Sequence, residues 1–185
     1  MITEDFSNSI SIGATAPNFE LLDTHGETCT LETFVGHDWL VLQFTCNHCP
    51  YVLGSDDRLN EVVSSLAGER IAWVGICSND AERYPQDSYE RMQERASSLP
   101  YRYLHDPSQE VARAYGAQVT PEFYIFSRSA SDWQLVWHGT IDDSPRDAAA
   151  ATTAYLLPTI QKLLNDEPLQ RDTTPVQGCS IKWRS

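Results

Sequence analysis

Residues 41–51, with the sequence Val-Leu-Gln-Phe-Thr-Cys-Asn-His-Cys-Pro-Tyr, constrain the fold of this chain more than any other segment. Their first half is apolar and β-prone, which is typical of a buried strand. Downstream, apolar residues recur at three- and four-residue spacing, as on one face of a helix, at Leu59, Val62, Val63 and Leu66. Cys46 and Cys49 separate the two patterns. The segment therefore predicts a strand, a C-x-x-C turn and a helix.

Cys46 is expected at the start of this helix, where free backbone N–H groups and the helix dipole carry partial positive charge. A thiol there is stabilised as a thiolate, so we expect the pKa of Cys46 to lie below its ordinary value of about 8.5. Cys49 follows one turn later on the same face, which brings the two sulfurs within reach of a disulfide bond. A zinc site would need a second ligand pair at similar spacing, and the sequence contains none. The pattern favours dithiol redox chemistry.

His48 immediately precedes the second cysteine. A protonated imidazole in this position stabilises the Cys46 thiolate and hence the reduced form of the pair. A pair with a stabilised reduced form is a stronger oxidant. The alternative is a histidine that faces solvent and takes no part in the chemistry.

Composition limits the class of protein. A length of 185 residues suits one domain with a core that needs no disulfide bonds. The net charge of −13, from 26 acidic and 13 basic residues, argues against nucleic acids and anionic membranes as partners. The first residues have no signal-peptide pattern and no long apolar run occurs, so we expect a cytoplasmic location. Stable disulfides are uncommon there, so the five cysteines are expected to form one catalytic pair and free thiols.

Strand patterns recur along the rest of the chain. Extended segments at 16–22 and 29–31 flank an Asp-Thr-His-Gly turn, as in a β-hairpin. Further strands are expected at 71–77, 101–104, 119–126 and 133–141. Pro121 at the head of an apolar strand is unusual because proline cannot donate to the sheet. A cis Thr120–Pro121 bond is expected there.

Helices are expected between these strands. Ser88 is the predicted N-cap of one helix. Asp106 is expected to cap a second helix, with Pro107 in its first turn and Gly116 at its end. A last helix contains Pro158, which is expected to kink it.

Short motifs elsewhere extend the pattern: Asn-His-Cys-Pro-Tyr-Val at 47–52, Ser-Asn-Asp at 78–80, Tyr-Pro-Gln-Asp-Ser at 84–88, Gly-Thr-Ile-Asp-Asp at 139–143 and Gly-Cys-Ser-Ile-Lys-Trp at 178–183. With these motifs and the order of its elements, the chain resembles the thioredoxin-like superfamily. Within it, the chain is similar to the redoxin branch of the alkyl hydroperoxide reductase/thiol-specific antioxidant type, in a peroxiredoxin-like group with a Cys-Asn-His-Cys motif. The resemblance implies an α/β fold, a three-layer sandwich in which helices flank a mixed central sheet, with an N-terminal β-hairpin extension.

The resemblance also implies roles for individual residues. Cys46 is the attacking thiolate and Cys49 the resolving thiol. Thr120 and a cis Pro121 face them across a substrate groove, where backbone groups receive an extended partner strand. Thr45 and Asn47, on either side of Cys46, are assigned to the same groove.

Three positions depart from the patterns of related families. Thioredoxins have Trp before the first cysteine, where this chain has Thr45. They also have a buried Asp six residues before that cysteine, as the base for the second thiol, and Leu40 stands there. Peroxiredoxins have Pro and Thr in a P-x-x-x-T-x-x-C pattern, and here those positions are Trp39 and Gln43. The sequence therefore identifies no base for Cys49, and it lacks the residues that bind a peroxide.

Three functions remain open at this point. The first is thiol–disulfide exchange through Cys46 and Cys49 with protein or small-molecule disulfide and thiol substrates, without a cofactor or metal. The second is a thiol-dependent peroxidase, in which Cys46 is oxidised to sulfenic acid and Cys49 closes the disulfide. The third is a soft-metal module that holds copper or zinc on Cys46, Cys49 and Cys179. The sequence leaves the oligomeric state undetermined.

The C-terminal segment contains a further cysteine. We expect a redoxin domain over residues 10–167 and a tail over 168–185 that docks on it through Val176, Ile181 and Trp183. Cys179 lies between these anchors. It is either a passive neighbour or a third thiol that docking brings close to Cys46 and Cys49.

Overall fold

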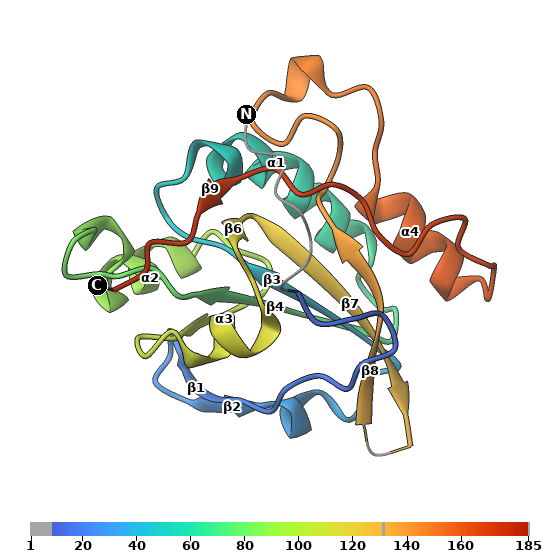
Figure 1. Ribbon diagram of the computed structural model, residues 1–185, viewed down its shortest axis with the longest axis horizontal. Coiled ribbons are helices and arrows are strands. Elements are labelled where there is room, and N and C mark those ends of the chain that lie inside the picture. The colour runs from blue at the N-terminus through green and yellow to red at the C-terminus, as the bar shows by residue number, and fades with distance from the viewer. Residues whose placement is uncertain (1–8, 131, 185) are drawn as a thin grey trace.

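The computed structural model describes residues 9–130 and 132–184, which form a seven-stranded mixed sheet and a separate two-stranded sheet (Figure 1). The strand order of the large sheet is β2-β1-β5-β4-β3-β7-β8, and β6 pairs with β9. The strands are β1 (Glu20–Asp23), β2 (Thr28–Thr30), β3 (Trp39–Phe44), β4 (Ile71–Cys77), β5 (Arg102–His105), β6 (Val119–Thr120), β7 (Glu122–Ser129), β8 (Asp132–Gly139) and β9 (Cys179–Ser180).

The centre of the large sheet is parallel and buried. β3 and β4 pair in parallel with Leu42 opposite Val74, and β4 pairs in parallel with β5. On the other side β7 runs antiparallel to β3, with Tyr124 opposite Leu42. Apolar runs without polar alternation are typical of strands covered on both faces, and β4 is one. Because β3 and β4 are parallel, their carboxyl ends meet at the same edge of the sheet, where Cys46 and Cys77 lie.

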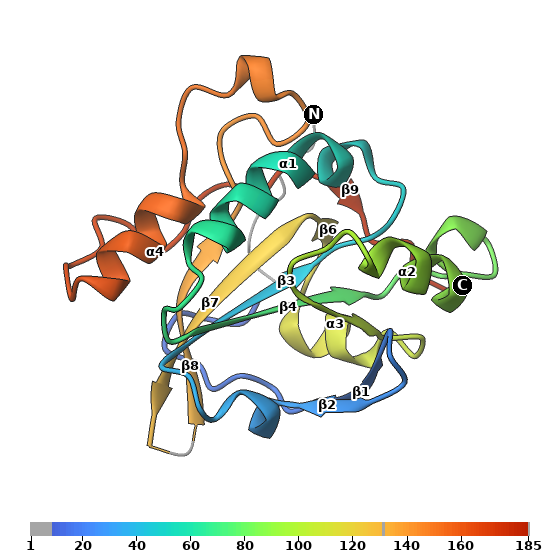
Figure 2. The same ribbon diagram turned by 180° about the vertical axis from the view of Figure 1, so that it is seen from behind.

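Helices cover both faces of this sheet (Figures 1 and 2). The first face is covered by α1 and α4, whose Leu59 and Ile160 join Val41, Phe123 and Trp137 in one core. The helices and 3₁₀ turns are η1 (Leu31–Phe34), α1 (Pro50–Ser65), η2 (Pro85–Asp87), α2 (Tyr89–Ala96), α3 (Glu110–Tyr115), η3 (Ala148–Ala150) and α4 (Leu156–Leu164). Among the described residues, no helix has the length and apolar character needed to cross a bilayer.

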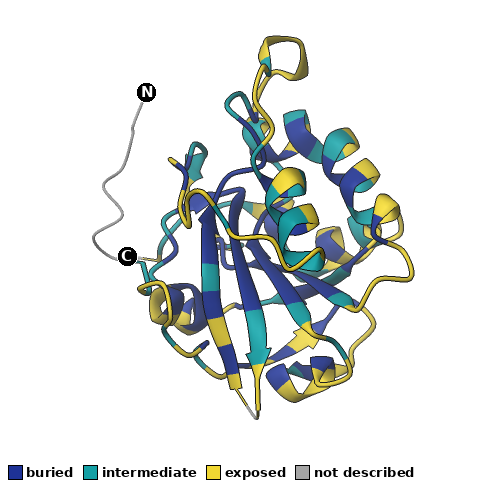
Figure 3. Cartoon of the chain, turned by 90° about the vertical axis from the view of Figure 1, so that its right-hand side faces the viewer, coloured by how far each residue is buried: buried dark blue, intermediate teal, exposed yellow. Residues whose placement is uncertain are grey.

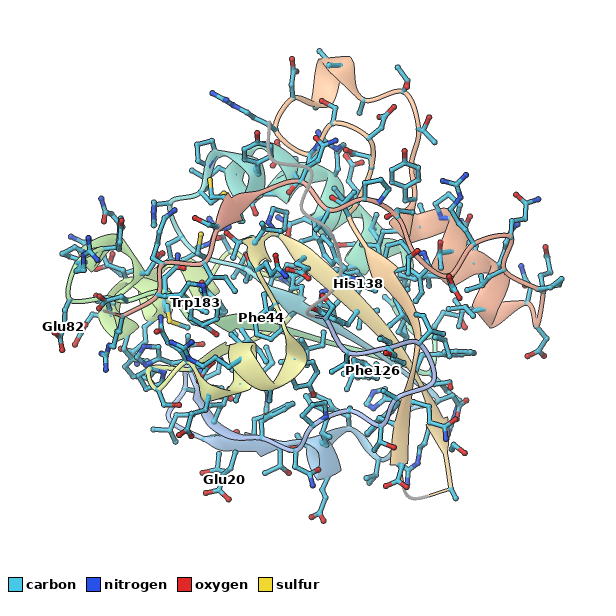
Figure 4. All side chains as sticks on the ribbon, in the orientation of Figure 1. Glu20, Phe44, Glu82, Phe126, His138 and Trp183 are labelled. Carbon is cyan, nitrogen blue, oxygen red and sulfur yellow. The ribbon has the colours of Figure 1, made fainter. Side chains whose placement is uncertain are left out.

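The opposite face carries α3 and an aromatic core. The Phe44 ring meets Tyr115 of α3 at a centroid distance of 5.8 Å and Tyr124 of β7 at 5.9 Å, both edge-on. Phe126 continues this cluster along β7 (Figure 4). Buried residues line the sheet on both sides and exposed ones lie on the outer helix surfaces (Figure 3). The three layers and the N-terminal hairpin agree with the predicted fold class.

The prediction for α3 is correct at its end and wrong at its start. Gly116 takes the left-handed C-cap position with φ 67°. The helix begins at Glu110, however, and not after Asp106. The Asp106 carboxylate instead accepts hydrogen bonds from Ser78 Oγ at 2.7 Å and from the backbone N–H of Ala112 at 3.1 Å. Asp106 therefore ties the residue after β4 to the first turn of α3, and it caps an N–H of that turn from outside the N-cap position, which is Gln109.

The expected kink at Pro158 is also wrong. α4 begins at Leu156, so Pro158 lies in its first turn. Backbone N–H groups in the first turn have no partner within the helix, and a proline is tolerated there.

Candidate functional site

The C-x-x-C segment connects β3 to α1, but the helix starts later than predicted. α1 begins at Pro50, and Cys49 is its N-cap with φ −69° and ψ 126°. Proline favours the first helical position because it lacks the N–H that would be unpaired there. Cys46 therefore lies in the loop before the helix, and Cys49 holds the position next to the free N–H groups of the first turn.

Both sulfurs lie against the turn at Thr120. All five cysteines are free thiols, and Cys46 and Cys49 are each 1% exposed. Cys46 Sγ lies 3.4 Å from the hydroxyl oxygen of Thr120, and Cys49 Sγ lies 3.2 Å from its carbonyl oxygen. The Thr120–Pro121 peptide bond is cis. The four residues that the sequence assigned to the centre of the site are thus in one place.

The prediction of a lowered pKa for Cys46 is wrong. Its thiol donates a hydrogen bond to Cys49, which raises the pKa of Cys46, and burial and the charge of Asp87 raise it further. The same hydrogen bond lowers the pKa of Cys49 to about 4, helped by backbone N–H groups of Val52 and Cys179. The helix start adds a smaller contribution, because Val52 lies in the first turn of α1, next to the N-cap residue Cys49. In the reduced pair the negative charge is therefore more stable on Cys49.

His48 lies beside Cys46 and is paired with a buried carboxylate. Its Nδ1 atom is 2.8 Å from Oδ2 of Asp87, and its ring stacks on Tyr84 at a centroid distance of 5.6 Å. Asp87 is fully buried and also accepts from the backbone N–H of Asn47 at 2.7 Å. Asp87 offsets the expected effect of His48, because its negative charge disfavours a thiolate on Cys46.

Asp87 is a site residue that sequence reasoning missed. One ligand atom each from Cys46, His48 and Asp87 lies within 4.8 Å of the other two. Such a set can move a proton, and its atom types also suit a zinc ion, although coordinating atoms must approach within about 2.0–2.3 Å of the metal. The signal was present in the Tyr-Pro-Gln-Asp-Ser motif, but nothing in the sequence places that loop against Cys46.

Thr45 and Asn47 are bound by neighbouring elements, and their assignment to the groove stays a prediction. Thr45 is 1% exposed, and its backbone N–H bonds to the carbonyl of Ile76 at the end of β4. Asn47 donates from Nδ2 to the Gln86 carbonyl at 2.9 Å and accepts from the Tyr103 hydroxyl at 2.9 Å. Through these bonds the loop binds β4, β5 and the turn at Gln86. Their structural role is to hold the loop that carries Cys46.

A second buried carboxylate supports the other side of the site. Glu122, directly after Pro121, accepts from the backbone N–H groups of Gln118 and Val119 at 2.9 and 3.0 Å. Its other oxygen accepts from the Tyr124 hydroxyl at 2.8 Å and lies 2.7 Å from His138 Nε2. This network holds the backbone before and after Thr120. The sequence did not indicate it, because a Glu within an apolar strand has no visible partner.

The remaining cysteines differ in their surroundings. Cys179 lies opposite Thr120 in the β6–β9 pair, and its sulfur is hydrogen-bonded to that of Cys49. Burial, followed by this hydrogen bond, raises the pKa of Cys179 to about 12. Burial also raises the pKa of Cys77 to about 12. Cys29 packs in the core on the α3 side of the sheet, away from the other four.

Comparisons with known proteins agree with this architecture. A sequence profile described as "AhpC/TSA family" matches residues 12–131. A crystal structure of a hypothetical protein from Sinorhizobium meliloti has a TM-score of 0.87 and 35% identity, over 96% of this chain and 97% of that chain. The crystal structure of an uncharacterized conserved protein from Geobacillus kaustophilus has a TM-score of 0.86 and 37% identity, over 96% of this chain and 94% of that chain.

A more distant structure shows the fold alone. The peroxidoxin BcpB of Mycobacterium tuberculosis has a TM-score of 0.58 and 20% identity, over 73% of this chain and 88% of that chain. Among curated proteins, no sequence matches the chain. The structural matches confirm the predicted thioredoxin-like fold, and they leave the chemistry to the residues of the site.

Proposed function

The chain belongs to the AhpC/TSA family, and from this premise we propose that it is a thiol–disulfide oxidoreductase that exchanges disulfides through Cys46 and Cys49. The observation that carries the proposal is the placement of two free thiols in hydrogen-bond contact, both against Thr120. Two cysteines at C-x-x-C spacing close a disulfide with little backbone movement. Thioredoxin-like architecture is compatible with this chemistry but does not by itself define it.

The attack begins with a proton that the two cysteines share. With the proton on Cys46, Cys49 is the thiolate, which is the more stable arrangement. With the proton on Cys49, its S–H donates to the Thr120 carbonyl, and the Thr120 hydroxyl donates to a Cys46 thiolate. Protons on such a pair belong to both groups. The second arrangement is the one that reacts, because it leaves the charge on Cys46.

The exchange then follows two displacement steps. The Cys46 thiolate attacks a sulfur of the partner disulfide, so a Cys46–partner bond forms and the partner's other sulfur leaves as a thiolate. Cys49 next loses its proton and attacks the Cys46 sulfur, which releases the second partner thiolate and closes the Cys46–Cys49 disulfide. The partner gains two electrons and the pair loses two. The backbone N–H groups of Val52 and Cys179, which stabilise a Cys49 thiolate, do not depend on the Cys46 proton and favour this second step.

We assign His48 the role of proton donor to the departing partner thiolate. It is close to the Cys46 sulfur, partly exposed, and fixed by Asp87 and Tyr84. A general acid must lie within reach of the atom it protonates, and the sulfur bound to Cys46 is the nearest reacting atom. Asp87 positions the ring through its contact with Nδ1.

Peroxidase activity has less support. Gln43 takes the place of the peroxiredoxin threonine, and its side-chain oxygen accepts from the indole N–H of Trp73 at 3.0 Å. That side chain is fully buried. A peroxide beside Cys46 therefore has no hydroxyl at this position to polarise it.

The test is reduction of insulin disulfides, followed as turbidity with a chemical reductant. We expect the protein to accelerate the reaction, and Cys46→Ser and Cys49→Ser each to lower the rate roughly a hundredfold or more, because the two residues act as a unit. Cys29→Ala is the matched control, since Cys29 is equally buried but packs elsewhere. Peroxide consumption and metal content are measured on the same samples. A protein that consumes peroxide or retains stoichiometric metal but leaves insulin untouched would contradict the proposal.

A further inference from the structure

The C-terminal segment occupies the position next to the reactive thiols where a partner strand is expected. β9 pairs antiparallel with β6, with Cys179 opposite Thr120 and Ser180 opposite Val119. The backbone N–H of Ile181 continues the pairing to the Gln118 carbonyl at 2.8 Å. Figures 1 and 2 show β9 beside β6, next to the start of α1. An extended peptide recognises an exposed strand edge through such main-chain bonds.

The residue that this strand presents to the site is a cysteine. The sulfur of Cys179 is in hydrogen-bond contact with that of Cys49, and the backbone N–H of Cys179 is also directed at Cys49. Cys49 therefore has a thiol neighbour on each side, Cys46 and Cys179. An extended chain with a cysteine next to a C-x-x-C pair has the form of a disulfide-exchange substrate.

The tail is held firmly on both sides of Cys179. Val176 and Ile181 are 4% and 3% exposed. The backbone N–H of Lys182 bonds to the side-chain oxygen of Asn79 at 2.8 Å. The guanidinium carbon of Arg113 lies 4.5 Å from the ring centroid of Trp183, which fixes the end of the tail on α3 (Figure 4). These contacts hold the tail in place, and none of them involves the side chain of Cys179.

Gly178 allows the backbone of the tail to lie close to the backbone of Thr120. A Cβ atom at this position would lie 2.3 Å from the carbonyl oxygen of Thr120, far inside contact distance. Because that neighbour is backbone, it cannot move aside as a flexible side chain could. A side chain at position 178 would therefore force the backbone of the tail away from Thr120, directly beside Cys179.

We infer that Cys179 is a third redox thiol, which exchanges with the Cys46–Cys49 disulfide to form a Cys49–Cys179 disulfide; this inference rests on the function proposed above. The Cys179 sulfur attacks the Cys49 sulfur, the Cys49–Cys179 bond forms, and the Cys46–Cys49 bond breaks. The proton of Cys179 ends on Cys46. The number of disulfides is unchanged, so the step needs no oxidant beyond the partner disulfide that oxidised the pair.

The charge distribution favours this step only after the pair is oxidised. In the reduced protein burial, and after it the hydrogen bond and the charge of the Cys49 thiolate, keep the proton on Cys179. Oxidation of Cys49 removes that charge, while the nearby Lys182 continues to favour a Cys179 thiolate. The product leaves Cys46 free as a thiol and fixes β9 covalently beside β6. The tail then acts as an internal substrate that closes the groove.

The experiment maps disulfides in the full-length protein after equilibration with glutathione disulfide, acid quenching and trypsin digestion. It uses a Cys29→Ala background, because no Lys or Arg precedes Arg58 and Cys29 would otherwise share a peptide with Cys46 and Cys49. A Cys46–Cys49 bond is then internal to one peptide. A Cys49–Cys179 bond is a cross-link between two peptides, since Arg171 and Lys182 flank Cys179.

We expect the background protein to yield both bonds, Cys46→Ser to yield only the cross-link, and Cys179→Ser to yield only the internal bond. Gly178→Ala should lower the cross-linked fraction several-fold in a protein whose circular dichroism is unchanged. An internal bond in the background protein, with no cross-link in either the background or the Cys46→Ser protein, overturns the inference and leaves the proposed function standing. If neither bond forms, the proposed function fails with it.

Discussion

The sulfur of Cys49 lies 3.2 Å from the carbonyl oxygen of Thr120, a residue 71 positions further along the chain. This contact joins the N-cap of α1 to the turn before β7. The same threonine offers its hydroxyl to Cys46, so one residue provides an acceptor for one thiol and a donor for the other. Thr120 therefore favours the arrangement with the charge on Cys46, whereas the contacts of Cys49 with Cys46 and with the first turn of α1 favour the charge on Cys49.

The first prediction concerns thiolate formation in the reduced protein. Because the pKa of Cys49 falls from 9.0 to about 4, thiolate absorbance near 240 nm should persist at pH 5 and disappear as the pH falls through about 4. Cys49→Ser should lose this absorbance. Since the folded-state pKa is lowered, the thiolate stabilises the reduced protein fully above pH 9, and the contribution fades as the pH falls towards 4. A single ordinary thiol titration near pH 8.5–9 in the reduced wild-type protein would contradict this result.

Removing the Asp87 charge should make Cys46 more reactive. Asp87 raises the pKa of Cys46, so Asp87→Asn should lower that pKa and speed alkylation of Cys46 by iodoacetamide several-fold at pH 7. The measurement is made in a Cys49→Ser background with mass-spectrometric identification of the alkylated peptide. Asp106→Asn is the control, because Asp106 is equally buried and hydrogen-bonded but does not act on Cys46. If Cys46 is alkylated at the same rate in the Asp87→Asn and Asp106→Asn proteins, the charge of Asp87 does not control the pKa of Cys46.

Glu122 should matter for the stability of the fold. Glu122→Leu leaves the N–H groups of Gln118 and Val119 and the side chain of His138 without their buried acceptor, so we expect a loss of about 3–5 kcal/mol in the free energy of unfolding. Glu122→Gln keeps an oxygen for the two N–H groups and should lose much less. Urea denaturation measures both. Insulin reduction by the folded Gln variant should stay close to the wild-type rate, and a Leu variant as stable as the wild type would refute the role of this network.

Much of the fold could be predicted from local patterns. The apolar runs of β3 and β4 and the Thr-Pro pair before β7 indicate a buried sheet with a turn at its edge, and each signal lies within a few residues. The start of α1 was misplaced because the helical spacing is visible only from Leu59 onward. The signal for the true start is Pro50, because proline favours the first position of a helix.

The electrostatics of the site could not be predicted in the same way. Asp87 meets Asn47 across 40 positions of sequence, and Cys179 meets Thr120 through pairing of two-residue strands. No periodic pattern in the sequence predicts either contact. The sequence indicated only that the tail carried apolar anchors and a cysteine. Tertiary structure decides whether such a thiol is a neighbour of the catalytic pair.

The most direct test of the account is an equilibrium redox titration of the Cys46–Cys49 pair in a Cys179→Ser background, with the disulfide fraction followed by mass spectrometry across glutathione and dithiothreitol buffers. The account predicts one reversible two-electron transition, with a midpoint between about −270 and −120 mV, the range of thiol–disulfide oxidoreductases. It predicts that the bond lies between Cys46 and Cys49. If the two cysteines remain free thiols at the most oxidising potential, or are oxidised individually without forming a bond, thiol–disulfide exchange is not the function of this site.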